Sequence, residues 1–98
     1  MRVLYAMKKI VLLSNKKYSA ESEDFLLSLI NQGCELICFV GLDCESWEEA
    51  MDELAIGDGS NPKYITTTSH PSESLDEAIN MAEHMKTGGS NNINVVEV

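Results

Sequence analysis

The sequence predicts a single α/β domain with an open, mostly parallel sheet of about four strands and helices on both faces. Two observations support this class. Continuous apolar runs at residues 10–13 and 36–40 suit short strands that are buried on both sides. The segments between such runs repeat their apolar residues every three or four positions, as amphipathic helices do. Strands that alternate with helices favour right-handed β-α-β units in one doubly wound sheet. We expect a flavodoxin- or Rossmann-like strand order, and favour the flavodoxin-like one.

The first half of the chain is predicted as strand, helix and strand. The strand at residues 10–13 ends at Ser14. Ser19 can cap the following helix, whose first turn is acidic, and Gly33 stops it. The strand at residues 36–40 is ended by Gly41. The buried side of the helix is predicted to consist of Phe25, Leu26, Leu29 and Ile30.

The second helix begins after Asp43 or Ser46, since Ser46 and Glu49 have the spacing of a capping box. A turn rich in glycine at residues 57–62 ends it. Its apolar residues recur at helical spacing and predict one buried side: Trp47, Ala50, Met51, Leu54 and Ala55.

The remaining elements are a strand, a helix and a final strand. A β-branched run predicts the strand at residues 64–68. A turn at residues 69–72 leads into the third helix, with Pro71 at or near its first position. After a loop at residues 86–92, residues 93–98 form the last strand, which could alternatively add antiparallel at an edge. The third helix is predicted to bury Leu75, Ala78, Ile79, Ala82 and Met85.

The charge is strongly negative and unevenly distributed. The formal net charge is -9, and all 16 acidic residues follow residue 20, whereas residues 1–18 contain five of the seven Lys and Arg residues. Nucleic-acid binding usually needs clustered Lys and Arg, so it is not expected here. An anionic membrane surface would likewise be repelled, whereas a basic protein would be attracted.

The acidic residues are most concentrated on and around the second helix. Its charged positions lie between the apolar ones, which predicts a negative surface on a rigid rod. Like charges four residues apart, such as Glu45 and Glu49, cost about a few tenths of a kcal/mol per pair. A basic partner would remove this repulsion. Without any intervening Lys, Arg or His, the region carries seven carboxylates: Asp43, Glu45, Glu48, Glu49, Asp52, Glu53 and Asp58.

Cysteine usage and hydropathy predict a cytoplasmic protein without metal or cofactor. Cys34, Cys38 and Cys44 lack Cys-x-x-Cys spacing, and two of them fall in an apolar stretch where a thiol packs as a small hydrophobe. No segment is long enough to span a membrane. Lys8 and Lys9 interrupt the apolar start, which argues against a signal peptide. We expect one domain over residues 1–98, in which residues 1–7 can be a loose extension.

The exposed rim at the carboxyl ends of the strands is the usual ligand location in such sheets. A hydrolase there would pair His70 with Ser69 or Cys44 and orient it with Asp43. A small-ligand or hydrolytic site on this rim is therefore the alternative function. The first loop lacks the glycines of a nucleotide site. The predicted rim gathers Asn15, Lys16, Tyr18, Asp43, Thr68, Ser69 and His70.

Two single residues have two interpretations each. Trp47 is the sole Trp; its position predicts core packing, with an aromatic anchor at an interface as the alternative. His70 precedes Pro71 and is either a turn residue at the helix entrance or a functional residue of the rim.

Three stretches carry a resemblance to a known group of small bacterial proteins. They are VGLDCESWEEAMDEL at residues 40–54, Gly57-Asp58-Gly59, and ITTTSHP at residues 65–71. The chain resembles, over most of its length from Lys8 onward, immunity proteins of contact-dependent growth inhibition systems. The resemblance implies a cytoplasmic inhibitor that binds the toxic carboxy-terminal domain of a delivered protein, such as a ribonuclease, and covers its active site.

Residue chemistry and resemblance lead to the same predicted function. We expect a non-enzymatic immunity protein that neutralises a basic toxin domain as a monomer in a 1:1 complex. Other options are an enzyme on the rim, or an adaptor that dimerises through an edge strand. The resemblance does not specify contact residues. On electrostatic grounds, the predicted partner-binding residues are Asp43, Glu45, Glu48, Glu49, Asp52, Glu53 and Asp58, with His70 beside them.

Overall fold

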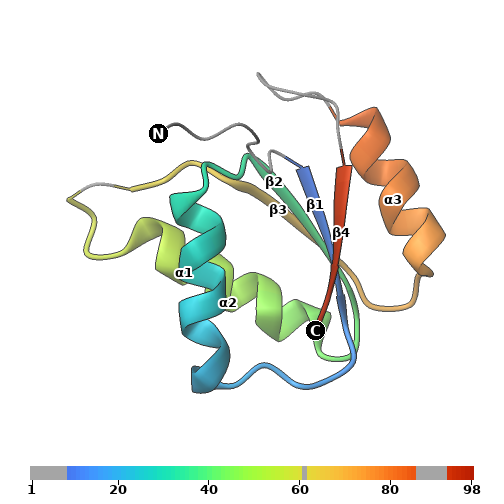
Figure 1. The fold of residues 1–98 in the computed structure, drawn as a ribbon, viewed down its shortest axis with the longest axis horizontal. Helices are drawn as coiled ribbons and strands as arrows, with labels where there is room; N and C mark the ends of the chain where they lie inside the picture. Colours follow the sequence, from blue (N-terminus) through green and yellow to red (C-terminus); the bar gives the residue numbers. More distant parts are fainter. Residues whose placement is uncertain (1–8, 61, 86–92) are drawn as a thin grey trace, which may run out of the picture.

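Four parallel strands form one sheet in the order β3-β2-β1-β4 (Figure 1). The computed structural model describes residues 9–60, 62–85 and 93–98. The strands are β1 (Lys9–Ser14), β2 (Leu36–Gly41), β3 (Thr66–His70) and β4 (Ile93–Glu97). The predicted α/β class and parallel sheet are confirmed. The antiparallel alternative for the last strand is wrong, because β4 runs parallel to β1.

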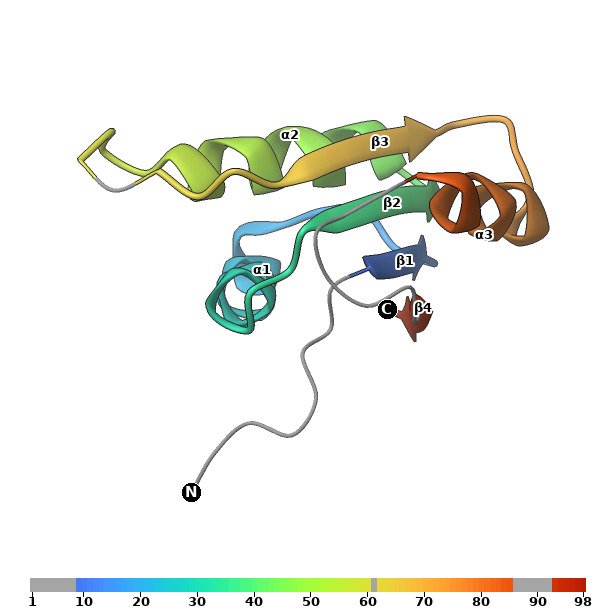
Figure 2. The same ribbon diagram turned by 90° about the horizontal axis from the view of Figure 1, so that it is seen from above.

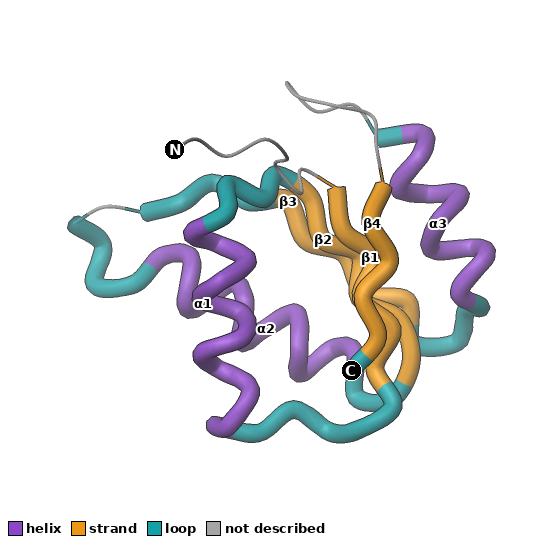
Figure 3. The backbone as a smooth tube through the Cα atoms, viewed as in Figure 1, coloured by secondary structure: helices purple, strands orange, loops and turns teal. Residues whose placement is uncertain are grey.

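The helices cover both faces of the sheet (Figures 2 and 3). A short 3-10 turn, η1 (Ala20–Ser22), precedes α1 (Glu23–Asn31), and α1 lies with α2 (Cys44–Ile56) on one face, called the α2 face below. Helix α3 (Leu75–His84) covers the other, the α3 face. Right-handed crossovers explain this division. The chain steps outward from β1 to β3 with its helices on one side, then returns to β4 in the opposite direction with its helix on the other.

The strand order is of the Rossmann type, in which the third strand pairs with the second. The favoured flavodoxin-like order is therefore wrong, because it would place the third strand beside the first. Helices α1 and α2 pack against each other on the same face, so α2 carries the chain outward to the open edge of β2.

Alternating side chains of the two central strands feed two cores. Ile10 of β1 and Phe39 of β2 are buried on the α2 face, whereas Val11 and Val40 are buried on the α3 face. Both sides of β1 and β2 are thus covered, which explains why their sequences are continuously apolar. The side chains of all three cysteines are buried, in agreement with structural packing.

The third strand and third helix begin later than predicted. The β-branched run suggested a strand at residues 64–68, but pairing with β2 sets β3 at Thr66–His70 and leaves Tyr64 91% exposed. Helix α3 starts at Leu75, not near Pro71, because Ser74 and Glu77 form a complete capping box. The predicted extension at residues 1–7 and loop at 86–92 lie outside the described residues.

Helix α3 is also attached to the sheet by a buried lysine. Lys9 of β1 has no exposed surface, and its Nζ donates a hydrogen bond of 3.0 Å to the Ala82 carbonyl oxygen. Ala82 lies near the C-terminal end of α3, where the helix dipole favours a cation. This contact joins residues 73 positions apart in the chain.

Candidate functional site

Helix α2 turns an apolar side to the sheet, as predicted. Trp47, Met51 and Ala55 are buried against the α2 face, together with Cys44 in the first turn. These positions repeat every three or four residues, which keeps them on one side of the helix. Ala50 and Leu54, also predicted as core, are partly buried against the same cluster.

The other side of α2 carries a run of carboxylates, called the acidic stripe: Glu45, Glu48, Glu49, Asp52 and Glu53. Glu48 is half-buried and the other four are exposed. Within the part of the chain that the structure describes, none of the five forms an ion pair with a Lys or Arg. The acidic stripe therefore faces solvent and is not neutralised by the described lysines.

Thr67 of β3 holds two members of the stripe together. Its Oγ1 lies 2.9 Å from Glu48 Oε2 and 2.7 Å from Asp52 Oδ1. A hydroxyl has one proton, so Thr67 can donate to only one of the two carboxylates at a time. Two acceptors thus converge on one donor, which leaves hydrogen-bonding capacity for an incoming cation. Thr67 was not anticipated, because its role depends on the register of β3 against α2.

Asp43 has a structural role at the start of α2. It adopts the left-handed conformation, with φ of 60°, and its Oδ2 accepts a hydrogen bond of 2.9 Å from the Tyr18 backbone N–H. The Tyr18 and Ser46 hydrogen bonds, with a smaller contribution from Lys17, hold the pKa of the Asp43 carboxyl below its ordinary value. The carboxylate ties the loop after β1 to α2, so its acceptors are already engaged.

Asp58 lies beyond α2 in the turn that follows it. Its Oδ1 accepts hydrogen bonds from the Ser60 backbone N–H at 2.9 Å and the Ser60 hydroxyl at 2.6 Å. Both bonds lower the pKa of the Asp58 carboxyl. This pattern stabilises the turn locally, as Asp commonly does in turns. Asp58 adds charge near the stripe but is not part of the helix surface.

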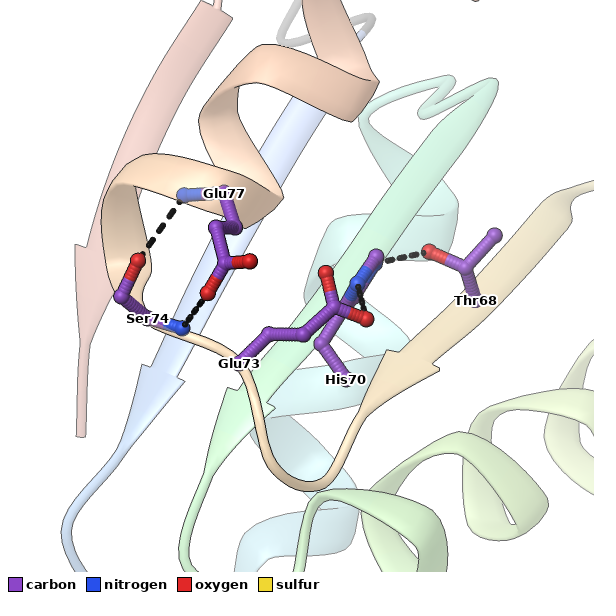
Figure 4. A network of polar contacts seen from close by, with 5 residues as sticks. All are labelled: Thr68, His70, Glu73, Ser74 and Glu77. Carbon is purple, nitrogen blue, oxygen red and sulfur yellow. Dashed lines mark hydrogen bonds and ion pairs between the residues drawn. The ribbon is translucent and has the colours of Figure 1, made fainter.

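His70 is the last residue of β3, and its side chain is covered rather than exposed on a rim (Figure 4). Only 2% of its surface is exposed, and its Nε2 lies 2.9 Å from Thr68 Oγ1. Its Nδ1 lies 3.2 Å from Glu73 Oε2 but outside hydrogen-bond geometry. The prediction that the strand ended at Thr68 placed His70 in a turn. As part of β3, the imidazole is covered and does not belong to the acidic stripe.

Thr68, which contacts His70, also contacts Cys38 on the α3 face. Burial raises the pKa of the Cys38 thiol, although a hydrogen bond from Thr68 and the nearby Lys9 ammonium act in the opposite direction. A buried neutral thiol is a poor nucleophile. With Cys38 fully covered, this network is consistent with structural support of the sheet.

Trp47 packs in the core, as favoured from its position. Its side chain is 0% exposed and its Nε1 donates a hydrogen bond of 3.1 Å to the Lys16 carbonyl oxygen. The Tyr18 ring meets it edge-on, with ring centroids 5.2 Å apart. Because Trp47 has no accessible surface, it is not an interface anchor in this conformation.

The crevice between β1 and β4 is the usual ligand position for this strand order. Here the Asn15 backbone N–H donates to the Val98 carbonyl, and the Val98 N–H donates to the Leu13 carbonyl, each at 2.9 Å. The Asn15 side chain also donates to Glu97 Oε2 at 2.7 Å. Asn15 and the end of β4 are therefore bonded to each other across this crevice.

The catalytic arrangement considered for the rim is not assembled. His70 points to the α3 face, and Ser69 alternates to the opposite face of β3. Cys44 is buried at the start of α2, and Asp43 is bonded to Tyr18 and Ser46 rather than to an imidazole. An open hollow is lined by Asp43, Cys44 and Pro71, but neither His70 nor Ser69 lines it, so the predicted nucleophile and base do not meet there.

These features define a small α/β protein with a Rossmann-type sheet and an acidic helix exposed to solvent. A family model described as a domain of unknown function (DUF7684) matches residues 2–98, so the chain belongs to this family. No curated protein and no solved structure gives a match to the chain.

Two further properties concern the residues for which the structure gives positions. None of their helices combines the length and apolar character that crossing a bilayer requires. Among the same residues, no three His, Cys, Asp or Glu side chains are grouped so that they could hold a metal ion.

Proposed function

We propose that this protein is a cytoplasmic immunity protein that binds a basic toxin domain, of nuclease type, and blocks its active site without catalysis. The observation that carries the proposal is the acidic stripe. Its carboxylates lie on a rigid helix, face solvent and lack cationic partners among the described residues. The resemblance to immunity proteins of contact-dependent growth inhibition systems supports the same function.

A nuclease cleft is complementary to this surface. Enzymes that bind nucleic acid present Lys and Arg to phosphate groups. Regularly spaced carboxylates on a helix can occupy such a cleft in place of the phosphates. The pair Glu48 and Asp52, held 2.9 and 2.7 Å from one hydroxyl, is suited to a Lys or Arg side chain that satisfies both carboxylates.

The stripe is unfavourable for the protein alone. Glu45–Glu49, Glu48–Asp52 and Glu49–Glu53 are like charges one helical turn apart, each costing about a few tenths of a kcal/mol. A cationic partner would convert this repulsion into attraction and would speed encounter. Binding should therefore weaken strongly as salt concentration rises.

The test is a nuclease assay with the toxin domain encoded by the reading frame directly upstream. The Glu49→Lys/Glu53→Lys variant removes two exposed carboxylates that make no hydrogen bond with the described residues. The matched control is Asp76→Lys/Glu83→Lys on α3, which changes the net charge equally at exposed positions on the other side of the sheet. Circular dichroism checks that both variants fold.

We expect the α2 variant to lose inhibition by at least about 100-fold, equivalent to roughly 2.8 kcal/mol of binding free energy. The α3 control should inhibit within a few-fold of the parent, because only general charge attraction is reduced. Equal inhibition by the α2 variant and the parent would overturn the acidic-stripe mechanism. If the parent protein does not bind the toxin domain encoded directly upstream, the proposal that it neutralises this toxin is overturned.

A further inference from the structure

An apolar groove lies directly beside the C-terminal end of α2. It is lined by Asp52, Ala55, Ile56, Lys63, Tyr64 and Ile65, and is called the α2 groove below. Tyr64 is 91% exposed and Ile56 is 58% exposed, the two highest values among the large apolar side chains of the described residues. Most of the apolar surface of these two side chains is therefore not buried by the fold.

The α2 groove is continuous with the acidic stripe. Ile56 follows Asp52 by four residues and Glu49 by seven, so the three side chains share one side of the helix. Asp52 belongs to both features, since it lines the groove and contacts Thr67. Apolar and anionic surfaces are thus adjacent over the last two turns of α2.

Backbone hydrogen bonds hold the far wall of the groove in place. The Lys63 N–H donates to the Ala55 carbonyl at 2.7 Å, and the Thr66 N–H donates to the Glu35 carbonyl at 3.0 Å. Tyr64 is therefore presented between two attachment points, one on α2 and one before β2. An aromatic ring on an attached segment loses little conformational freedom when it is covered.

The charge around the groove selects the occupant. A second copy of this chain would bring its own acidic stripe against the first, and each copy has a formal net charge of -9. A basic protein would instead be attracted to the acidic stripe and would cover the exposed apolar side chains of the groove. Exposed apolar side chains that are rimmed by polar groups are typical of protein interaction sites.

We infer that the α2 groove receives an apolar side chain of the basic partner while flanking Lys or Arg residues of that partner reach the acidic stripe. The inference rests on the proposed function and adds the apolar anchor of the interface. Lys63 also borders the groove, so the cationic groups of the partner are drawn to the Asp52 side. Replacing Lys63 by Gln should tighten binding.

The test uses two synthetic helical peptides with identical lysine content, one with leucines along one side and one with glutamines in their place. Each is titrated into the ¹⁵N-labelled protein and followed by NMR. We expect the leucine peptide to bind about tenfold more tightly, because one buried leucine contributes on that scale. Its largest shifts should fall on Ile56, Tyr64 and Ile65.

Variants separate the groove from the stripe. Tyr64→Ala should remove the preference for leucine and leave the affinity for the glutamine peptide unchanged. The matched control is Val95→Ala on β4, which shortens another exposed apolar side chain, 49% exposed, and should preserve the preference. Glu49→Lys/Glu53→Lys should weaken both peptides equally.

Equal affinity for the two peptides, or binding of neither, overturns the α2 groove as an apolar anchor. Shifts of Tyr64 that depend on protein concentration without peptide also overturn it, since a second copy would then be the occupant. The nuclease assay with the upstream toxin domain judges the proposed function separately. Groove failure with retained inhibition and inhibition failure with an intact groove are therefore distinguishable results.

Discussion

The carboxyl-end rim of the sheet and the solvent side of α2 use their polar groups in opposite ways. On the rim, Asp43 is bonded to Tyr18 and Ser46, and Asn15 is bonded to Glu97 and Val98. On α2, five carboxylates are without cationic partners among the described residues. Topology alone points to the rim. The polar groups of the rim are thus used within the fold, whereas those of the acidic stripe face solvent.

The comparison predicts that substitutions of residues bonded or buried within the fold change stability, and that stripe substitutions change binding. The largest effect should come from Trp47→Ala, with a loss of about 3–5 kcal/mol of unfolding free energy. The indole is fully buried and donates to the Lys16 carbonyl, so the variant loses packing and leaves an acceptor unpaired. Urea denaturation followed by circular dichroism measures the loss. Trp47→Phe is the control and should lose less; a loss below about 1 kcal/mol in Trp47→Ala would show that this end of α2 is not core.

His70→Ala should have the next largest effect, about 1–3 kcal/mol of unfolding free energy. The buried imidazole contacts Thr68 and approaches Glu73, and its removal leaves a cavity and takes one hydrogen-bond partner from the Thr68 hydroxyl. Equilibrium unfolding gives the stability, and inhibition is compared at equal concentrations of folded protein. Reduced inhibition by the folded variant would contradict the separation of His70 from the binding surface.

Asp43 should make the stability of the protein depend on acid pH. Its carboxyl pKa is lowered in the folded state from an ordinary value of 3.8, so its contribution is present above that value and is lost as pH falls. Asp43→Asn should therefore be less stable than the parent at pH 6, and the difference should shrink towards pH 3. Urea midpoints across this range test it. Ser46→Ala, which removes only one donor, should show a smaller pH-dependent difference; a difference that grows on acidification would contradict the prediction.

The smallest predicted effect on stability concerns the acidic stripe, where a substitution should stabilise the protein. Glu49→Gln removes two like-charge pairs, with Glu45 and Glu53, and should stabilise the protein by about a few tenths of a kcal/mol per pair at low salt. The same variant should inhibit less well. Denaturation at low salt and at 1 M NaCl measures the gain, which should disappear when charges are screened. A loss of stability at low salt would mean that Glu49 contributes to the fold.

Periodicity was sufficient to predict most of the fold. The two continuous apolar runs became the central strands because both of their faces are covered. The stripe of α2 also follows from spacing, with Trp47, Met51 and Ala55 inward and the carboxylates outward. Strand order was less accessible, because it depends on which helices share a face.

The errors in the candidate site trace to one boundary. The turn at residues 69–72 predicts a third helix with Pro71 at or near its first position, whereas the Ser74-x-x-Glu77 capping box, also visible in the sequence, sets the start of α3. The two-residue displacement of β3 placed His70 in a turn instead of a buried strand. Thr67 and Tyr64 were missed for the same reason, since their contacts and exposure depend on the register of β3.

The rate at which the buried amine of Lys9 is chemically modified can measure local opening of this fold. Lys16, Lys17 and Lys63 are exposed and would react at once with an acetylating reagent, whereas Lys9 reacts only after α3 lifts from β1 and breaks the contact with Ala82. The rate at which Lys9 is modified therefore reports how often the last crossover detaches from the sheet. A toxin clamped across α2 on the opposite face would leave that rate unchanged unless the two faces open together.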